Sequence, residues 1–235
     1  MNYNQIQTIA FDADDTLWVN EPIFVKTEEK CEQIISRYTP VERIKEKIYE
    51  YELKNLKLFG YGVKGFTLSM IETAIELTTG KISGNEIQEL IDLGKDMLQH
   101  PIHLLPGVQE TIQQLAGKYE LLIITKGDLF DQESKIARSG LADLFDHIEI
   151  VSEKNVATYA HIMQRYGIAK EHFLMIGNSL KSDILPICTL GAKAIHVPYH
   201  TTWVHEKVEE RHLEGVEYEE LSSLEYLFKL LKKGK

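Results

Sequence analysis

Three aspartates and a threonine follow a short apolar segment near the start of the chain. The stretch reads Ile6-Gln-Thr-Ile-Ala-Phe-Asp-Ala-Asp-Asp-Thr-Leu-Trp18, and its apolar half has the length and composition of a strand buried in a parallel sheet. Asp12 and Asp14 then lie just beyond the carboxyl end of that strand, where open α/β sheets bind their ligands. Two carboxylates one residue apart repel each other unless a cation or a shared proton is present. The pattern therefore predicts either a catalytic carboxylate pair or an acidic turn that caps the following helix.

Polar residues also follow three later predicted strands, at 121–124, 147–151 and 173–176. They are a hydroxyl and an ammonium after the first strand, an ammonium after the second, and an amide and a carboxylate after the third: Thr125, Lys126, Lys154, Asn178 and Asp183. The first and third sets adjoin glycine turns, whose backbone amides can hold an anion. Because parallel strands end at one edge of a sheet, we expect these side chains to converge on Asp12 and Asp14.

The remaining sequence supplies the elements that must position these residues. Helical spacing of apolar residues dominates 19–103, and two helix starts carry capping signals, at Thr39-Pro40-Val41-Glu42 and Ser83-Gly-Asn-Glu86. After that stretch the chain alternates helices with short apolar strands, which is typical of a parallel sheet covered on both faces. We predict an α/β fold with a Rossmann-like parallel sheet core at 1–18 and 104–235, and an inserted α-helical domain at 19–103.

Composition argues against several classes of protein. The chain has 235 residues, 43% of them hydrophobic, and a formal net charge of −10, which disfavours nucleic-acid binding because phosphate backbones are held by clustered Lys and Arg. No apolar run approaches the ~20 residues of a membrane span, and no signal peptide is predicted. Cys31 and Cys188 are too few for a disulfide scaffold and are interpreted as small core residues. We expect a cytoplasmic protein, and no heptad run or apolar edge predicts an interface between copies.

The four polar segments together resemble the motifs of the haloacid dehalogenase (HAD) superfamily, in the correct order and over essentially the whole chain. The first motif, DxDxT, is matched by Asp12-Ala-Asp-Asp-Thr16, the second by Thr125, the third by Lys154 and the fourth by Gly177-Asn-Ser-Leu-Lys-Ser-Asp183. The helical insert is similar to the C1 cap of that family.

The resemblance implies a phosphatase mechanism. Asp12 is then the nucleophile that forms an aspartyl-phosphate, and Asp14 is the general acid and base. Mg²⁺ is expected to bind Asp12, the backbone carbonyl of Asp14, and the fourth motif at Asn178 and Asp183. Substrate phosphate is expected to bind Thr125, Lys126 and Lys154. The acid at position 14 favours phosphoester hydrolysis over dehalogenation, because an alkoxide leaving group needs a proton.

One departure from the family pattern concerns the metal. Asn178 stands where phosphatases of this type usually carry an aspartate, and we hypothesise that its amide oxygen binds the metal with lower affinity. Two alternatives to a phosphatase of a small phosphorylated metabolite stay open: a sugar phosphomutase, and a ligand-binding protein of this fold with little turnover. Four histidines near the ends of the helical insert and the last strand lack a compactly spaced third ligand, so no zinc site is predicted.

Overall fold

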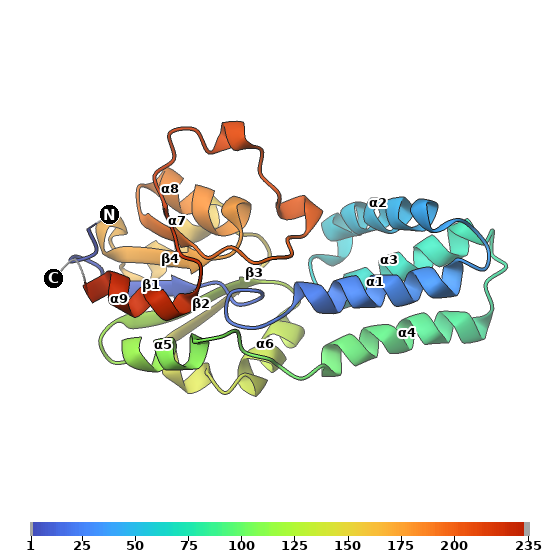
Figure 1. The fold of residues 1–235 in the computed structure, drawn as a ribbon, viewed down its shortest axis with the longest axis horizontal. Coiled ribbons are helices and arrows are strands. Elements are labelled where there is room, and N and C mark those ends of the chain that lie inside the picture. Colours follow the sequence, from blue (N-terminus) through green and yellow to red (C-terminus); the bar gives the residue numbers. More distant parts are fainter. Residues whose placement is uncertain (1, 233–235) are drawn as a thin grey trace. The chain divides into compact units, whose positions relative to one another are not determined.

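The computed structural model describes residues 2–232, and within them six parallel strands form one sheet (Figure 1). The strand order is β3-β2-β1-β4-β5-β6. The strands are β1 (Thr8–Phe11), β2 (Glu120–Lys126), β3 (His147–Val151), β4 (Phe173–Gly177), β5 (Lys193–His196) and β6 (Glu219–Glu220). The predicted parallel α/β sheet is confirmed, and β6 is a two-residue addition at its edge. Since β1 pairs with both β2 and β4, Phe11 lies opposite Ile123 and Ile176, and Asp12 leaves the sheet at its centre.

Helices cover both faces of this sheet because successive strand residues point to opposite sides. Ile9 and Phe11 belong to the apolar core on one face, whereas Ala10 belongs to the core on the other. The first face is covered by α5 (Val108–Leu115), α6 (Leu129–Arg138) and α9 (Leu227–Lys232), and the second by α7 (Val156–Tyr166) and α8 (Leu185–Leu190). Strands buried on both sides explain the unbroken apolar runs seen in the sequence.

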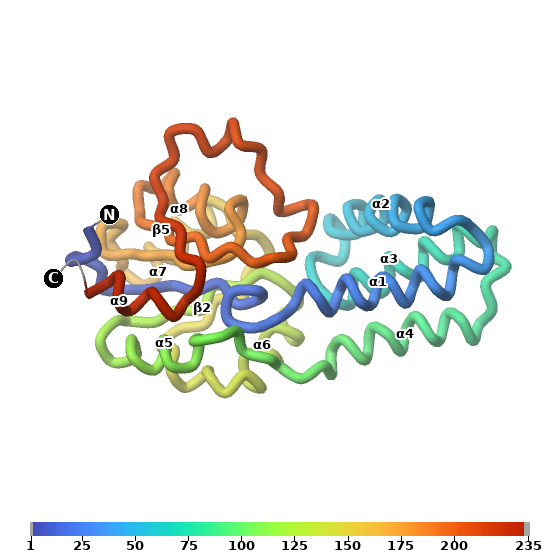
Figure 2. Tube along the Cα trace, viewed as in Figure 1, coloured from blue at the N-terminus to red at the C-terminus, as the bar shows by residue number. Residues whose placement is uncertain are grey.

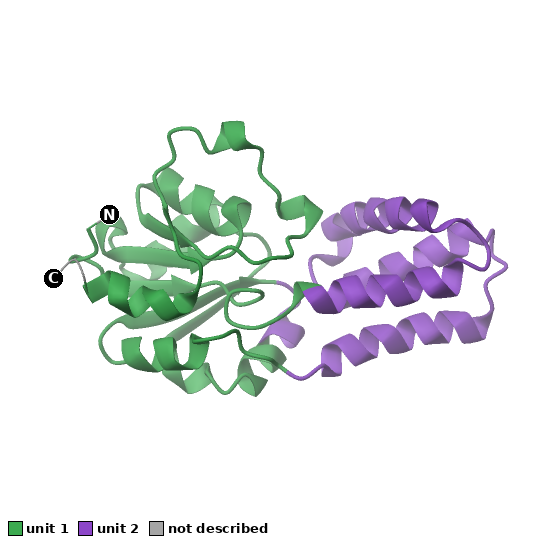
Figure 3. Ribbon diagram, in the orientation of Figure 1, with its two compact units in different colours: residues 1–21, 102–126, 133–235 green, residues 22–101, 127–132 purple. Residues whose placement is uncertain are grey.

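A second set of helices lies between β1 and α5 in the chain, as the trace in Figure 2 shows. They are α1 (Glu21–Ile35), α2 (Val41–Phe59), α3 (Val63–Leu77) and α4 (Gly84–Gln99). Their shared core contains Cys31, Ile44, Met70 and Leu90. By contact pattern the chain divides into two compact units, coloured in Figure 3: a helical unit of residues 22–101 and 127–132, and a sheet unit of the remaining described residues.

Two predicted helix starts have different outcomes. The capping box at Ser83 is confirmed, since its hydroxyl accepts from the amide of Glu86 while the Glu86 carboxylate accepts from the amide of Ser83. The cap predicted at Thr39 is wrong. Pro40, not Thr39, is the residue flanking α2, and no side chain caps that helix. The extended backbone of Pro40 (ψ 145°) moves the helix start one residue along the chain, so Thr39 is too far from the first helical amides.

The segment after β4 is irregular. A π-helical turn, Leu180–Ile184, leads directly into the short helix α8. Between β5 and β6 the chain makes a long excursion at 197–218 that contains two 3₁₀ turns, Val204–Glu206 and Glu210–His212.

Cys188 in α8 is only half-buried, whereas Cys31 is buried as expected. Within residues 2–232 no helix has the length and apolar character needed to cross a membrane.

Candidate active site

The loop after β1 is a tight turn that separates its three aspartates. The carbonyl of Ala13 accepts from the amides of Thr16 and Leu17, at 3.2 and 2.8 Å. Asp15 has a left-handed backbone (φ 61°), and its carboxylate accepts from the amides of Asn20 and Glu21, both within 3.1 Å. Asp15 therefore caps the start of α1. The helix-cap interpretation of this acidic segment applies to Asp15 and leaves Asp12 and Asp14 available for chemistry.

Asp12 lies in a buried group that we call the Asp12 cluster: Asp12, Thr16, Lys154 and Asp183. The Thr16 hydroxyl donates to Asp12 Oδ2 at 2.8 Å, and Lys154 Nζ donates to Asp12 Oδ1 and, at 2.8 Å, to Asp183 Oδ1. The Lys154 side chain is only 1% exposed. Two carboxylates thus face one ammonium in a dry environment, and one negative charge has no counterpart within the cluster.

Burial and neighbouring charge have opposite effects on the pKa values of both Asp12 and Lys154. Burial raises the pKa of Asp12 above its ordinary value, and the adjacent Lys154 only partly reverses that effect. For Lys154, burial alone would lower the pKa, but Asp12 and Asp183 outweigh it and raise the pKa, so the ammonium stays charged. A buried cluster with surplus negative charge is suited to bind one further cation.

The turn after β4 brings Asp183 to this position. A Cβ atom at Gly177 would lie 2.3 Å from Asp183 Oδ2, so only glycine lets the carboxylate pack against the strand end. The amide of Ser179 donates to the same oxygen at 3.0 Å, and the Ser179 hydroxyl accepts from the amide of Ser182. The glycine and serine of the fourth motif therefore have a structural reason: they fix the Asp183 carboxylate beside Lys154.

The Thr16 hydroxyl connects Asn178 to Asp12. Thr16 Oγ1 accepts from the backbone amide of Asn178 at 3.1 Å, and it lies 3.3 Å from the side-chain Oδ1 of Asn178 and 2.8 Å from Asp12 Oδ2. One hydroxyl proton cannot satisfy both of these oxygens. The carboxylates of Asp12 and Asp183 and this amide oxygen are the hard ligands that Mg²⁺ prefers, so the residues present fit that ion. Among residues 2–232, no group of three His, Cys, Asp or Glu side chains lies close enough together to hold a metal ion.

Asp14 belongs to a second group, the Asp14 cluster: Asp14, Trp18, Asn20 and Lys135. Lys135 Nζ donates to both carboxylate oxygens of Asp14 at 3.0 Å and to Asn20 Oδ1 at 2.9 Å. The indole Nε1 of Trp18 donates to Asp14 Oδ1 at 2.7 Å. The Asp14 side chain is 22% exposed. Lys135 was not predicted, because a lone lysine in the last turn of a helix is usually a solvated or helix-dipole residue.

The two residues predicted to bind phosphate at the end of β2 differ in their surroundings. Thr125 is buried and lies opposite Ile150 of β3. Lys126 Nζ contacts Ser182 Oγ at 2.9 Å and Glu206 Oε1 at 2.5 Å. The sequence contains no signal for the Glu206 contact, since 80 residues separate the pair. The structure thus joins Lys126 to the fourth motif and to the 197–218 excursion.

Glu206 belongs to a third polar group, which it forms with Lys126, Ser179 and Ser182 at the turn after β4. Its Oε2 accepts from the hydroxyls of Ser179 and Ser182, at 2.5 and 2.6 Å. Burial would raise the pKa of this carboxyl, but the Lys126 ammonium and the two hydroxyls outweigh it and lower the pKa to about 2. Glu206 is therefore ionised at every ordinary pH and anchors the excursion to the fourth motif.

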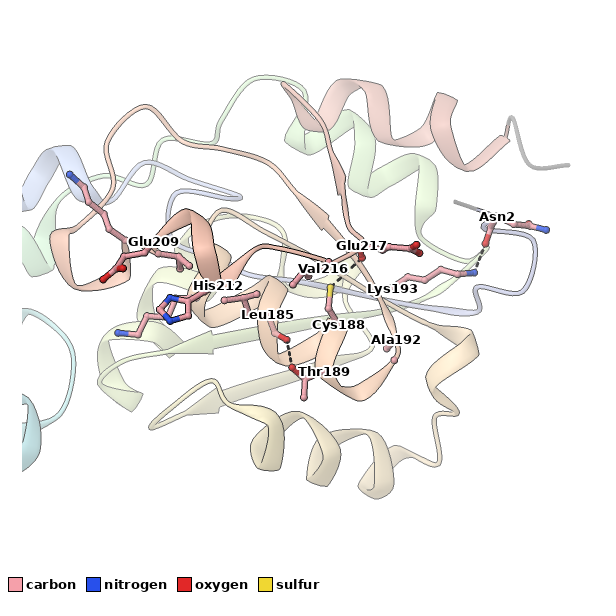
Figure 4. A pocket seen from close by; sticks show the side chains of 15 residues that line it. Asn2, Leu185, Cys188, Thr189, Ala192, Lys193, Glu209, His212, Val216 and Glu217 are labelled. Carbon is pink, nitrogen blue, oxygen red and sulfur yellow. Dashed lines mark hydrogen bonds between the residues drawn. The ribbon is translucent and has the colours of Figure 1, made fainter.

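A cavity of about 1090 Å³ lies elsewhere in the sheet unit, between α8 and residues 207–217. Figure 4 shows Leu185, Cys188 and Val216 lining it, with Cys188 Sγ donating to the Glu217 carbonyl at 3.4 Å. None of its lining residues belongs to the Asp12 or Asp14 cluster. The catalytic groups predicted from the sequence are therefore not in this cavity.

Comparison with known proteins agrees with the motifs. Residues 6–187 match the haloacid dehalogenase-like hydrolase family. A haloacid dehalogenase-like family hydrolase from Xanthomonas campestris has a similar structure, with a TM-score of 0.86, 40% identity, and coverage of 98% of this chain and 92% of that one. The 5-amino-6-(5-phospho-D-ribitylamino)uracil phosphatase of Escherichia coli is 23% identical over 240 residues, which are 94% of this chain and 95% of that protein. Glyceraldehyde 3-phosphate phosphatase of Pyrococcus furiosus is 29% identical over 101 residues, and the aligned region spans only 42% of its length.

The family match covers most of the chain, and the Xanthomonas structure matches nearly all of it at 40% identity. The fold class and the family resemblance inferred from the four motifs are both confirmed. In the structure Lys154 directly contacts both Asp12 and Asp183, which belong to two of those motifs. The protein is an enzyme of the hydrolase class, and the chain belongs to the haloacid dehalogenase-like hydrolases.

Proposed function

We propose that this hydrolase is a magnesium-dependent phosphatase, which acts in the cytoplasm on a small phosphorylated metabolite through an aspartyl-phosphate. The observation that supports this most strongly is the Asp12 cluster, where a buried carboxylate is oriented by Thr16 and Lys154 and one negative charge is left without a counterpart. The two curated relatives described above are both phosphatases of small phosphate monoesters.

In this proposal Asp12 is the nucleophile and Asp14 the acid and base. An oxygen of Asp12 attacks phosphorus, the bond to the leaving alkoxide breaks, and the alkoxide takes a proton from the Asp14 carboxyl. Asp14 then takes a proton from water, whose oxygen attacks phosphorus and releases inorganic phosphate, which restores Asp12. Lys154 and Thr16 orient Asp12 throughout.

Mg²⁺ would be held by Asp12, the backbone carbonyl of Asp14, Asn178 and Asp183. When bound, it supplies positive charge that offsets the phosphoryl oxygens beside the carboxylates. Thr125, Lys126 and Lys154 are the proposed phosphate ligands. Lys126 is paired with Glu206. To bind phosphate, its ammonium must therefore either contact Glu206 and phosphate together or leave Glu206.

The helical unit is proposed as the cap that selects the substrate, since helical lids of this kind exclude macromolecules and bulk water. The curated relatives are named for a triose phosphate and for a uracil with a phosphorylated ribityl chain. Small sugar and polyol phosphates are therefore the first substrates to assay, followed by nucleoside monophosphates.

The test is phosphate release from such a panel, with and without Mg²⁺, by wild type and Asp12→Asn. We expect magnesium-dependent turnover that falls at least about 10³-fold in Asp12→Asn, because the nucleophile is lost. The matched control is Asp143→Asn, the same change at an exposed aspartate. Turnover that persists in Asp12→Asn would contradict the aspartyl-phosphate. A requirement for a sugar bisphosphate would instead indicate a phosphomutase.

A further inference from the structure

Lys135 is a buried lysine on α6 that reaches Asp14 from a distant part of the chain. Its side chain is 10% exposed, and the contacts of its ammonium include both Asp14 oxygens and Asn20 Oδ1. Burying a lysine to this extent is weak evidence for a stabilising role, because an apolar side chain of similar volume would avoid the loss of hydration.

The contacts of Lys135 bear on the orientation of the Asp14 carboxylate. Trp18 Nε1 donates to Asp14 Oδ1 only, and Trp18 itself is fully buried. A single hydrogen bond at one oxygen leaves the carboxylate free to rotate about that bond. Lys135 contacts both oxygens, so together with Trp18 it fixes the plane of the carboxylate as well as its position.

Asn20 ties the same ammonium to the segment that follows the catalytic turn. Asn20 lies directly before α1, and its backbone amide donates to the carboxylate of Asp15 at 2.8 Å. Lys135 is thereby held on one side by a residue whose own position is fixed by the helix cap. The Lys135 ammonium is therefore held in a defined position from which it contacts Asp14.

We infer that Lys135 is a positioning residue for the acid and base carboxyl of Asp14. This inference rests on the proposed phosphatase function. The nucleophile Asp12 has a different ammonium partner, Lys154, which contacts Asp12 and Asp183. Loss of Lys135 therefore affects delivery of the proton to the leaving oxygen and leaves nucleophilic attack by Asp12 in place.

Substrates with different leaving groups distinguish a loss of Asp14 positioning from a general loss of active structure. An alkyl phosphate releases a strongly basic alkoxide that needs a proton from Asp14, whereas p-nitrophenyl phosphate releases a stable phenolate that does not. In Lys135→Met we expect kcat for the best alkyl phosphate to fall between about 10-fold and about 100-fold, because misplaced catalytic groups lose rate on that scale. The kcat for p-nitrophenyl phosphate stays within about twofold, and KM changes little for either substrate.

Two further variants complete the kinetic test. Lys135→Arg keeps a cationic donor and restores part of the alkyl phosphate rate, while Lys229→Met, at an exposed lysine of α9, has no effect on either substrate. Equal losses on both substrates in Lys135→Met would show a merely structural role and overturn the inference. An unchanged alkyl phosphate rate would overturn it as well.

A spectroscopic measurement tests the inference without turnover. The chain has two tryptophans, so in a Trp203→Phe background the single indole N–H resonance reports the bond from Trp18 to Asp14. We expect this resonance to move in Lys135→Met and in Asp14→Asn, and to stay unchanged in Lys229→Met. If wild type hydrolyses no phosphate monoester, the proposed function fails, and the indole resonance still decides the positioning role: no movement in Lys135→Met refutes it.

Discussion

Asp12 and Asp14 are two residues apart in the chain, yet their clusters differ in how charge is matched. In the Asp12 cluster, the Lys154 ammonium is shared by two carboxylates, and its side chain is almost completely buried. In the Asp14 cluster, the Lys135 ammonium contacts the carboxylate of Asp14 and the neutral amide of Asn20, at a more exposed position. Over the residues that define each cluster, the first carries surplus negative charge and the second is neutral.

This difference agrees with the separate tasks proposed for the two aspartates. A buried cluster with surplus negative charge gains stability when a dication binds, which suits the carboxylate that is proposed to attack phosphorus beside a metal. A neutral cluster has no such need, and its carboxylate has one well-defined orientation. Three changes test whether the charge balance, and not the residue types alone, controls stability and metal binding.

The largest effect is expected from Lys154→Met. Removing the ammonium leaves two buried carboxylates facing each other, so the free energy of unfolding should fall by about 3 kcal/mol. The same change at Lys135 should cost about 1 kcal/mol, because Asp14 can turn toward water. Urea unfolding with and without Mg²⁺ measures both, and Mg²⁺ should restore part of the loss only in Lys154→Met. Equal losses for the two lysines would remove the basis of the comparison.

A smaller effect is expected from Asn178→Asp, which adds a carboxylate to the cluster that already has surplus negative charge. Without metal this variant should melt at a lower temperature than wild type, because the added charge is repelled by Asp12 and Asp183. With metal it should bind Mg²⁺ about tenfold more tightly, since ligand charge raises affinity. Isothermal calorimetry with Mg²⁺ alone measures this affinity. If the affinity does not change, Asn178 is not a metal ligand.

The smallest effect is expected from Glu206→Gln, a change at a carboxylate that is paired with the ammonium of Lys126. The loss should be about 1 kcal/mol at pH 7, because the charged hydrogen bonds weaken but their geometry is kept. The pKa of Glu206 is about 2 in the folded protein and 4.5 ordinarily, so its contribution is present above about pH 4.5 and disappears as the pH falls toward 2. Unfolding of both proteins across this range measures it, and a difference that persists at pH 2 would contradict the assignment.

Much of the fold was predictable because its signals are local. The apolar runs that became β1, β2 and β4 are buried on both faces and contain few polar residues, whereas β3 is partly exposed and includes a histidine and a glutamate. Ser83 and Asn155 begin helices as their residue types indicate, each with its side chain accepting from an amide three residues later. The cap predicted at Thr39 was wrong because α2 begins one residue later, after Pro40. The edge strand β6 and the turns of 197–218 have too few residues for any periodicity to appear.

The sequence by itself determined the sheet and the motif positions, since parallel strands with polar ends must bring those ends to one edge. Of the candidate site residues, Lys154, Asn178 and Asp183 lie around Asp12 and its partner Thr16, whereas Lys126 contacts Ser182 and Glu206. The sequence did not determine which lysine serves which aspartate. Lys135 and Asp14 are 121 residues apart, Lys126 and Glu206 are 80 apart, and nothing local distinguishes these lysines from solvated ones. Only the tertiary structure decided these pairings, because a buried charge takes as its partner whichever opposite charge the packing of distant elements brings within contact.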